Sequence, residues 1–241
     1  MRSSKLPAGV PTGYWRAPGD NGNTWATQSF IGELAHAAGR DPLDFTLGLL
    51  AEVPTVTFAG LAGGTGRAFD PSKMVTVLKL AAEKAGWGKK LPRGQGQGFA
   101  LTHTNNSYVA MIADVSVSRA GELSIQKITA VVDAGLIINL SSAESQVQGS
   151  ILDGISAAWF QKLTIERGAA EQLNFPDYPQ LRANQAPRIV EVHFIKSTAA
   201  PTGLGEPALP PAAPAVCNAI FAATGKRVRT LPILDQDLRW S

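Results

Sequence analysis

The chain has 241 residues, of which 44% are hydrophobic and 17% charged, with a formal net charge of +3 and a pI near 9.1. This length and apolar content suffice to bury a core in one large domain or two small ones. Basic residues cluster only at Lys226, Arg227 and Arg229, which is typical of a solvated helix end and disfavours nucleic-acid binding. The single cysteine, Cys217, excludes a disulfide within the chain and a cysteine-ligated iron–sulfur cluster. No apolar run reaches the length of a membrane span, and the histidines lack metal-ligand spacing, so we predict no protein ligand to a metal.

Helical periodicity dominates the first third of the sequence. The predicted helices run from Thr24 to Ala38, from Pro42 to about Leu50 and from Pro71 to Ala85. Asp41 and Asp70 each precede a proline, as in a helix N-cap followed by proline in the first turn. Residues 52–66 are rich in glycine, which predicts a loop or linker.

The following section changes to a period of two. We predict strands from Tyr108 to Val117 and from Leu123 to Val132, which a tight turn joins into an antiparallel hairpin. A long helix through Val147 and Trp159, a strand from Ile189 to Ile195, a helix ending at Gly225 and an extended tail complete the chain. This order predicts an α+β fold that mixes helices with antiparallel strands.

The segment Arg93–Gly98 has the glycine content of a phosphate-binding loop. No clear strand precedes it and no clear helix follows it, so the phosphate-loop interpretation is weak. We expect these glycines only to shape the approach to the hairpin.

Glu206 is the most informative residue of the chain. It follows Gly205 and precedes Pro207, in a stretch that is otherwise apolar and opens into a helix. Glycine lets the backbone pass close to a bound group, and proline restricts the turn. A carboxylate in apolar surroundings is costly unless its charge is used. Two interpretations remain: a solvated glutamate at a helix entrance, or a carboxylate that acts on a bound group.

Arg16 lies beside a rigid turn, in the sequence Trp-Arg-Ala-Pro-Gly that ends at Gly19. Its planar guanidinium could bind a phosphate or an oxyanion, or it could be an ordinary surface arginine. Gln146, in the predicted long helix, has both a donor and an acceptor and could hydrogen-bond the edge of a heterocycle or face solvent.

Six stretches follow the order of one known family. They are Gly13–Gly19, Thr27–Ala35, Val131–Asn139, Gln146–Gly149, Asn174–Pro179 and the long stretch from Glu206 to Ile233. Together they resemble the molybdenum-binding subunit of the xanthine dehydrogenase and aldehyde oxidase superfamily, within it most of all the isoquinoline 1-oxidoreductase β-subunit group. Such subunits are several times longer, and the resemblance implies that this chain is a C-terminal portion of one. Within it we distinguish a helical entry region with linker, 1–66, from an α+β region, 67–241, that carries the glutamate loop.

The resemblance implies roles for particular residues. It makes Glu206 the catalytic base and places Trp15, Arg16 and Ala17 against the molybdenum centre. It also assigns pterin-cofactor contacts to Gln146 and Gly205. Two positions depart from the family pattern: Gln148 stands where a glutamate is usual, and Leu140 where a proline is common.

The implied activity is that of a molybdenum hydroxylase that oxidises an N-heterocycle or an aldehyde with water as the oxygen source. The implied cofactor is molybdenum–molybdopterin in its cytosine dinucleotide form. Expected partners are the upstream half of the molybdenum subunit, a small iron–sulfur subunit that receives the electrons and, in exported relatives, a cytochrome. Because the family has both exported and cytoplasmic members, the localisation stays open. The alternative is a non-catalytic split or truncated remnant that packs on a partner subunit.

Overall fold

The computed structural model describes residues 9–58 and 67–241. Its helices are α1 (Asp20–Ala37), α2 (Pro42–Ala51), α3 (Pro71–Ala85), α4 (Leu140–Trp159), α5 (Ala212–Thr224) and a short 3-10 helix (Ile233–Asp235). Its strands are β1 (Val56–Phe58), β2 (Arg67–Phe69), β3 (Gln95–Thr104), β4 (Ser107–Val117), β5 (Leu123–Asp133), β6 (Ile165–Glu166), β7 (Ala169–Ala170) and β8 (Ile189–Phe194). The fold class is α+β, as the sequence predicted. No helix in the described ranges is long and apolar enough to cross a membrane.

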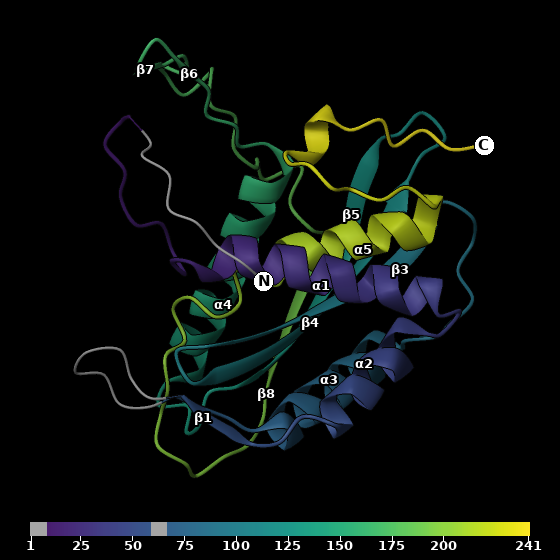
Figure 1. Ribbon diagram of the computed structural model, residues 1–241, viewed down its shortest axis with the longest axis vertical. Coiled ribbons are helices and arrows are strands. Elements are labelled where there is room, and N and C mark those ends of the chain that lie inside the picture. The colour runs from purple at the N-terminus through teal and green to yellow at the C-terminus, as the bar shows by residue number, and fades with distance from the viewer. Residues whose placement is uncertain (1–8, 59–66) are drawn as a thin grey trace.

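A four-stranded sheet in the order β3-β4-β5-β8 forms the centre of the structure (Figure 1). The pairs β3–β4 and β4–β5 are antiparallel, whereas β5 and β8 run parallel because α4 connects them. The predicted hairpin, long helix and later strand are therefore all confirmed.

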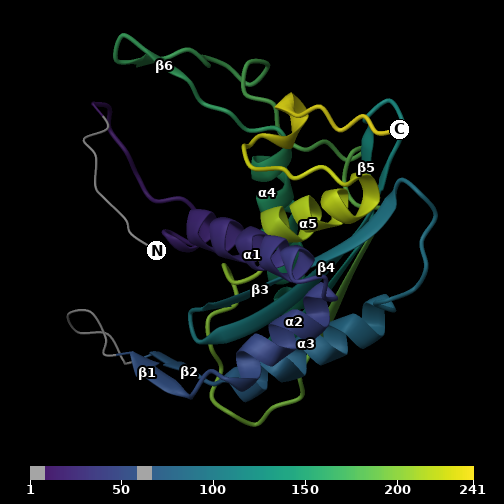
Figure 2. The same ribbon diagram turned by 45° about the vertical axis from the view of Figure 1, so that its right-hand side comes forward.

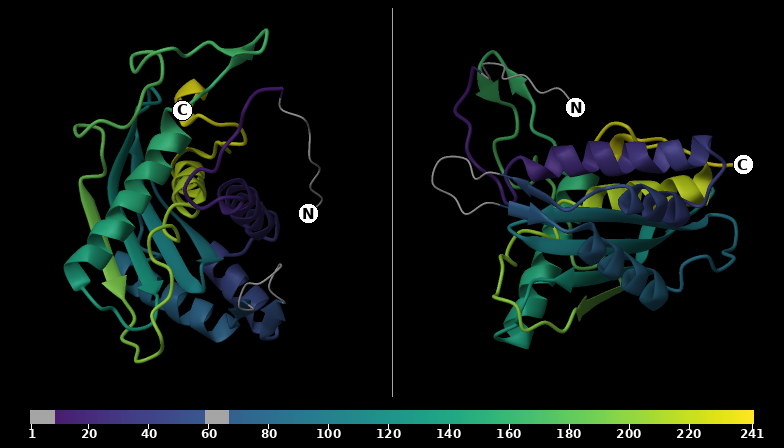
Figure 3. Two further views of the ribbon diagram at one scale, coloured as in Figure 1. Left: turned by 90° about the vertical axis from the view of Figure 1, so that its left-hand side faces the viewer. Right: turned by 60° about the horizontal axis from the view of Figure 1, so that its bottom comes forward.

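Helices cover both faces of this sheet (Figures 2 and 3). One core joins α4 and α5 to residues of β4 such as Val109 and Met111, and α1 lies outside α5. The second core joins α3 to the alternate residues Ala110 and Ile112. Since both faces of β4 are covered, that strand is buried along almost its whole length.

The predicted caps of α2 and α3 are confirmed. The Asp41 carboxylate accepts hydrogen bonds from the backbone N–H groups of Leu43 and Asp44, and Asp70 accepts one from Ser72 at 2.9 Å. These bonds satisfy donors that the first turn of a helix leaves free.

Residues 95–104 correct the sequence prediction. They form the edge strand β3, not an irregular approach to the hairpin. The glycines have a packing function: a Cβ at Gly96 would lie 2.4 Å from the carbonyl oxygen of Ala219, and one at Gly98 would lie 2.1 Å from the Ala219 nitrogen. Glycine in this strand is thus required because the backbone of α5 approaches it directly.

The predicted loop over residues 52–66 is also partly wrong. Within it, Val56–Phe58 forms β1, which pairs with β2 in an antiparallel ribbon. Residues 59–66 lie outside the described ranges, and the division of the chain at residue 66 stays a prediction.

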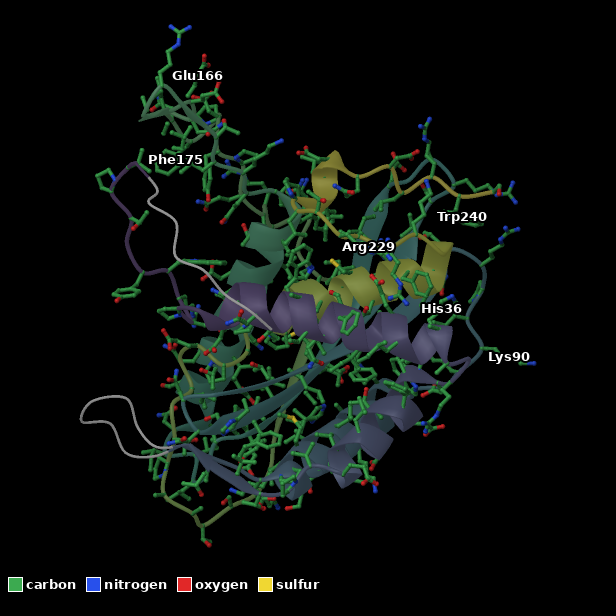
Figure 4. The ribbon with its side chains drawn as sticks, viewed as in Figure 1. His36, Lys90, Glu166, Phe175, Arg229 and Trp240 are labelled. Carbon is green, nitrogen blue, oxygen red and sulfur yellow. The ribbon has the colours of Figure 1, made fainter. Side chains whose placement is uncertain are left out.

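A long excursion between α4 and β8 carries the small β6–β7 hairpin away from the body (Figures 1 and 3). Phe175 on this arm is 82% exposed (Figure 4). The arm therefore presents apolar side chains to solvent in the described structure.

The basic residues after α5 are only partly solvated: Arg229 is exposed, as predicted, whereas Arg227 is partly buried. The Arg227 guanidinium lies 3.3 Å from the centroid of the Phe221 ring, and Arg229 forms two hydrogen bonds with the carboxylate of Glu33 on α1. They tie the C-terminal segment to α1 and α5.

Replacing Gly98 by alanine should destabilise the chain by at least about 2 kcal/mol, because the new methyl group would meet the backbone of α5. Urea denaturation of the 241-residue chain measures this change. Gly22→Ala is the matched control: it lies in α1 with no atom within 4 Å of the added Cβ, and it should be neutral or slightly stabilising. Equal stability of the two variants would contradict the packing function of Gly98.

Candidate active site

Glu206 is held by groups from three separate parts of the chain. Its Oε1 accepts a hydrogen bond from the backbone N–H of Ala17 at 3.1 Å, and its Oε2 accepts one from Nδ2 of Asn105 at 2.7 Å. Its carbonyl oxygen accepts a hydrogen bond from Ser150 of α4 at 3.2 Å. Both the backbone and the half-buried carboxylate of Glu206 are therefore fixed in orientation.

Arg16 fastens the glutamate loop to α4. Its Nε donates to the carbonyl oxygen of Gly205 at 2.5 Å, and its Nη2 donates to the backbone oxygen of Gln146 at 3.2 Å and to the Gln146 Oε1 at 3.5 Å. Nη1 lies 3.8 Å from Oδ2 of Asp153. The planar guanidinium uses its fork to join two backbone segments and one carboxylate.

Ala17 has an unusual backbone conformation. Its φ is 57°, and its side chain is 1% exposed. Left-handed φ values are rare for residues other than glycine, asparagine and aspartate. A hydrogen bond from Asn21 to the carbonyl oxygen of Arg16 supports the turn. The strained turn directs the Ala17 N–H toward Glu206, and its small side chain fits the buried position.

Asn105 is a site residue that the sequence analysis missed. Asn105 and Asn106 connect β3 to β4 with φ values of 52° and 59°, which is the geometry of a two-residue type I′ hairpin turn. The carbonyl oxygen of Asn105 accepts a hydrogen bond from the N–H of Gly203 at 3.0 Å. A Cβ on Gly203 would lie 2.5 Å from that of Asn105, so glycine is needed for this contact. Asn-Asn is a recognisable hairpin signal once the strand before it is identified.

The structure brings together five of the six residues that the sequence analysis selected: Arg16, Ala17, Gln146, Gly205 and Glu206. The sixth, Trp15, is 44% exposed and lines a neighbouring groove of about 950 Å³ that extends along α4 to the arm. Leu140, the other departure from the family pattern, is the first residue of α4, which Asn139 caps by accepting a hydrogen bond from the Ser142 N–H at 2.9 Å.

The polar groups of the site fit a ligand with hydrogen-bonding edges. The Gln146 side chain is exposed. Gly205 lies next to it, since a Cβ added at Gly205 would be 3.5 Å from the Gln146 Oε1. A second hollow of about 270 Å³ adjoins Gln146 and is lined by exposed apolar residues, among them Ile138, which is 77% exposed. An exposed amide beside an apolar hollow is a feature of a small-molecule site.

Comparison with known proteins finds a family model, related sequences and a solved structure. The family model described as a molybdopterin cofactor-binding domain matches residues 50–187, a range that includes Asn105 and Gln146 but ends before Glu206. The chain is 32% identical to a protein of Gluconacetobacter polyoxogenes named membrane-bound aldehyde dehydrogenase [pyrroloquinoline-quinone], over 94% of this chain and 29% of that protein. It is 28% identical to isoquinoline 1-oxidoreductase subunit beta of Brevundimonas diminuta, over 91% of this chain and 26% of that protein. The chain thus spans less than a third of these relatives.

A solved structure has the same fold. Aldehyde oxidoreductase from Desulfovibrio gigas superposes with a TM-score of 0.67 at 14% sequence identity, over 93% of this chain and 41% of that one. These findings confirm the resemblance that the sequence motifs carried.

Asp153→Asn should alter the pH dependence of stability. Burial raises the pKa of the Asp153 carboxyl above its ordinary value, although the charge of Arg16 opposes the shift. The folded chain therefore holds this proton more tightly than the unfolded chain, so Asp153 costs stability as the pH rises above about 4. The variant should be slightly more stable than the parent at pH 7, with the gain shrinking toward pH 4, because solvent screens this half-exposed group.

Urea denaturation between pH 4 and pH 8 measures this difference, with the exposed Asp177→Asn as the control. A variant that is less stable than the parent at pH 7 would show that the contact with Arg16 outweighs the cost of burial.

Proposed function

The chain belongs to the molybdopterin cofactor-binding domain family, and we propose that it forms part of a molybdenum hydroxylase in which Glu206 is the general base. The substrate class is an aldehyde or an N-heterocycle, and water supplies the oxygen. The observation that carries this proposal is the double hydrogen bonding of the Glu206 carboxylate by Ala17 and Asn105. A carboxylate held at both oxygens beside an exposed amide and a hollow suits proton abstraction from a bound reactant.

The residues around Glu206 divide the work. Arg16 and Gln146 would hold the cofactor, Gln146 through its exposed amide and Arg16 by fixing Gln146 and the backbone of Gly205 in place. When bound, the molybdenum cofactor supplies the two-electron oxidant. Glu206 takes the proton on Oε1, whose bond from Ala17 at 3.1 Å is longer than the 2.7 Å bond to Oε2. Each carboxylate oxygen keeps acceptor capacity beyond its single hydrogen bond, so neither contact has to break.

Electrons must leave through groups outside this chain. Cys217 is its only cysteine, whereas an iron–sulfur cluster is held by several cysteine thiolates. This supports a separate iron–sulfur subunit or segment as the acceptor. We further propose the cytosine dinucleotide form of the cofactor, an upstream half of the subunit that completes the site and, for an exported enzyme, a cytochrome.

Two other outcomes compete with this function. The chain could be a remnant that packs on a partner without holding the cofactor. The second is a quinone-dependent dehydrogenase, because the name of the Gluconacetobacter relative assigns pyrroloquinoline quinone to that protein. Metal and quinone analysis of the purified complex separates all three, because only the molybdenum hydroxylase contains molybdenum and pterin in proportion to the chain.

Glu206→Gln should abolish turnover, with a loss of at least about 100-fold, while molybdenum content and folding stay near the parent level. The amide keeps the shape of the side chain, and rotation of the Asn105 amide lets Asn105 accept from it. It cannot accept a proton at neutral pH. Steady-state kinetics and metal analysis of the co-purified complex provide the measurement, with the exposed Glu171→Gln as the control. Rapid turnover by a fully loaded Glu206→Gln enzyme would exclude Glu206 as the base.

Arg16→Ala should lower molybdenum retention in the same complex, because the clamp between Gly205 and Gln146 is lost. We expect a fall of a few degrees in melting temperature and no unfolding, since hydrogen bonds from a charged group contribute about 1.5–3 kcal/mol. The control is Arg182→Ala, an exposed residue of the arm. Parent-level metal content and activity in Arg16→Ala would remove this residue from the cofactor site.

A further inference from the structure

A second cavity of about 310 Å³ lies away from Glu206, where α1, α2, α5 and the edge strand β3 meet. Its α1 wall begins at Gln28, about 12 Å along the helix from Asp20 where α1 starts. None of its lining residues belongs to the Glu206 site.

Apolar and aromatic side chains form part of the walls, and polar residues that include Asp41 line the rest. The Asp41 carboxylate is already engaged, because it accepts hydrogen bonds from the first turn of α2 and from Nε1 of Trp87 at 3.2 Å. Ile31 comes from α1, Phe99 from β3 and Phe221 from α5, while Trp87 closes the side toward α3 and packs edge-on against Phe99. A volume near 300 Å³ with such walls is at the lower end of small-molecule pockets. The cavity thus suits a compact ligand with an apolar body.

Arg227 brings a positive charge to this wall without a carboxylate partner among the described residues. Its guanidinium lies over Phe221 and donates to two neutral acceptors, the carbonyl oxygen of Gly32 at 3.0 Å and Oδ1 of Asn218 at 3.4 Å. The nearby carboxylate of Glu33 is already engaged by Arg229. Burial lowers the pKa of Arg227, while the charge of Glu33 opposes this shift.

Thr46 adds a buried polar group that lacks a partner. Its side chain is 3% exposed, and its hydroxyl oxygen makes no hydrogen bond within the described structure. His36 and Arg40 stand at the solvent side of the cavity (Figure 4 labels His36). Buried polar groups are normally hydrogen-bonded, so an unsatisfied hydroxyl in a cavity wall points to a bound molecule.

We propose that this cavity binds a small organic carboxylate whose apolar body lies between Phe99 and Phe221. The carboxylate group meets the remaining N–H groups of Arg227, because guanidinium and carboxylate have matching planar geometry. The Thr46 hydroxyl forms a hydrogen bond with a polar atom of the ligand. This site is independent of the proposed function, since it shares no residue with the Glu206 cluster.

Isothermal titration of the 241-residue chain with benzoate tests the proposal, with benzyl alcohol as the uncharged analogue. Benzoate should bind at least ten times more tightly than benzyl alcohol, and the indole N–H resonance of Trp87 should shift on binding. Arg227→Gln should weaken benzoate binding at least tenfold, whereas the control Arg167→Gln, at an exposed arginine of the arm, should leave it unchanged.

A second variant covers the case in which Arg227→Gln fails to fold. Ala222 is exposed at the cavity, and Ala222→Phe should block the cavity while leaving all its polar groups in place. Loss of benzoate binding in Ala222→Phe together with full binding in Arg167→Gln supports the proposal. Equal binding of benzoate and benzyl alcohol, unchanged binding in Ala222→Phe, or no benzoate binding at tens of millimolar overturns it.

Discussion

The close contact between α5 and the edge strand β3 determines where the candidate site can form. Gly96 and Gly98 allow the backbone of the helix to lie directly on the strand. The strand continues to the turn at Asn105, and the loop before the helix carries Glu206. One contact thus sets the positions of both partners in the 2.7 Å hydrogen bond that orients the carboxylate.

Arg16 completes this arrangement from the other end of the chain. It has no role in the sheet, yet it connects the Gly205 carbonyl to α4 and, through the adjacent Ala17 N–H, touches Glu206 as well. The Arg16 and Ser150 side chains hold the backbone around Glu206. The Ala17 N–H and the Asn105 side-chain amide hold its carboxylate. Such mutual support is what a preorganised catalytic group requires, since its position must not depend on solvent-exposed flexible chains.

The sequence predicted the helices best where local chemistry decided the outcome. Asp41 and Asp70 are caps whose effect is complete within one turn. The apolar stretch from Tyr108 to Val117 marks a strand whose alternate residues pack into different cores. Prediction failed at Gln95–Thr104 because the glycines there serve a contact with Ala219, a residue more than 100 positions away. With that strand missed, the Asn105–Asn106 turn could not be identified, and Asn105 was left out of the site. Arg16 and Glu206 were selected because the family motifs carried them; nothing in their spacing indicates that they meet.

The separation between Ala17 and Glu206 also constrains when the site can exist. Their hydrogen bond spans 189 residues of sequence, whereas the β3–β4 hairpin closes over a two-residue turn. Contacts between segments far apart in sequence cost more loop-closure entropy than local contacts, and they form only when the intervening structure is in place. The hairpin that carries Asn105 can therefore form early. The Glu206 loop takes its final position only after α5 and the turn at Ala17 have formed. A chain in which these contacts have not formed lacks the hydrogen bonds that orient the Glu206 carboxylate, so the geometry of the site depends on completion of the fold.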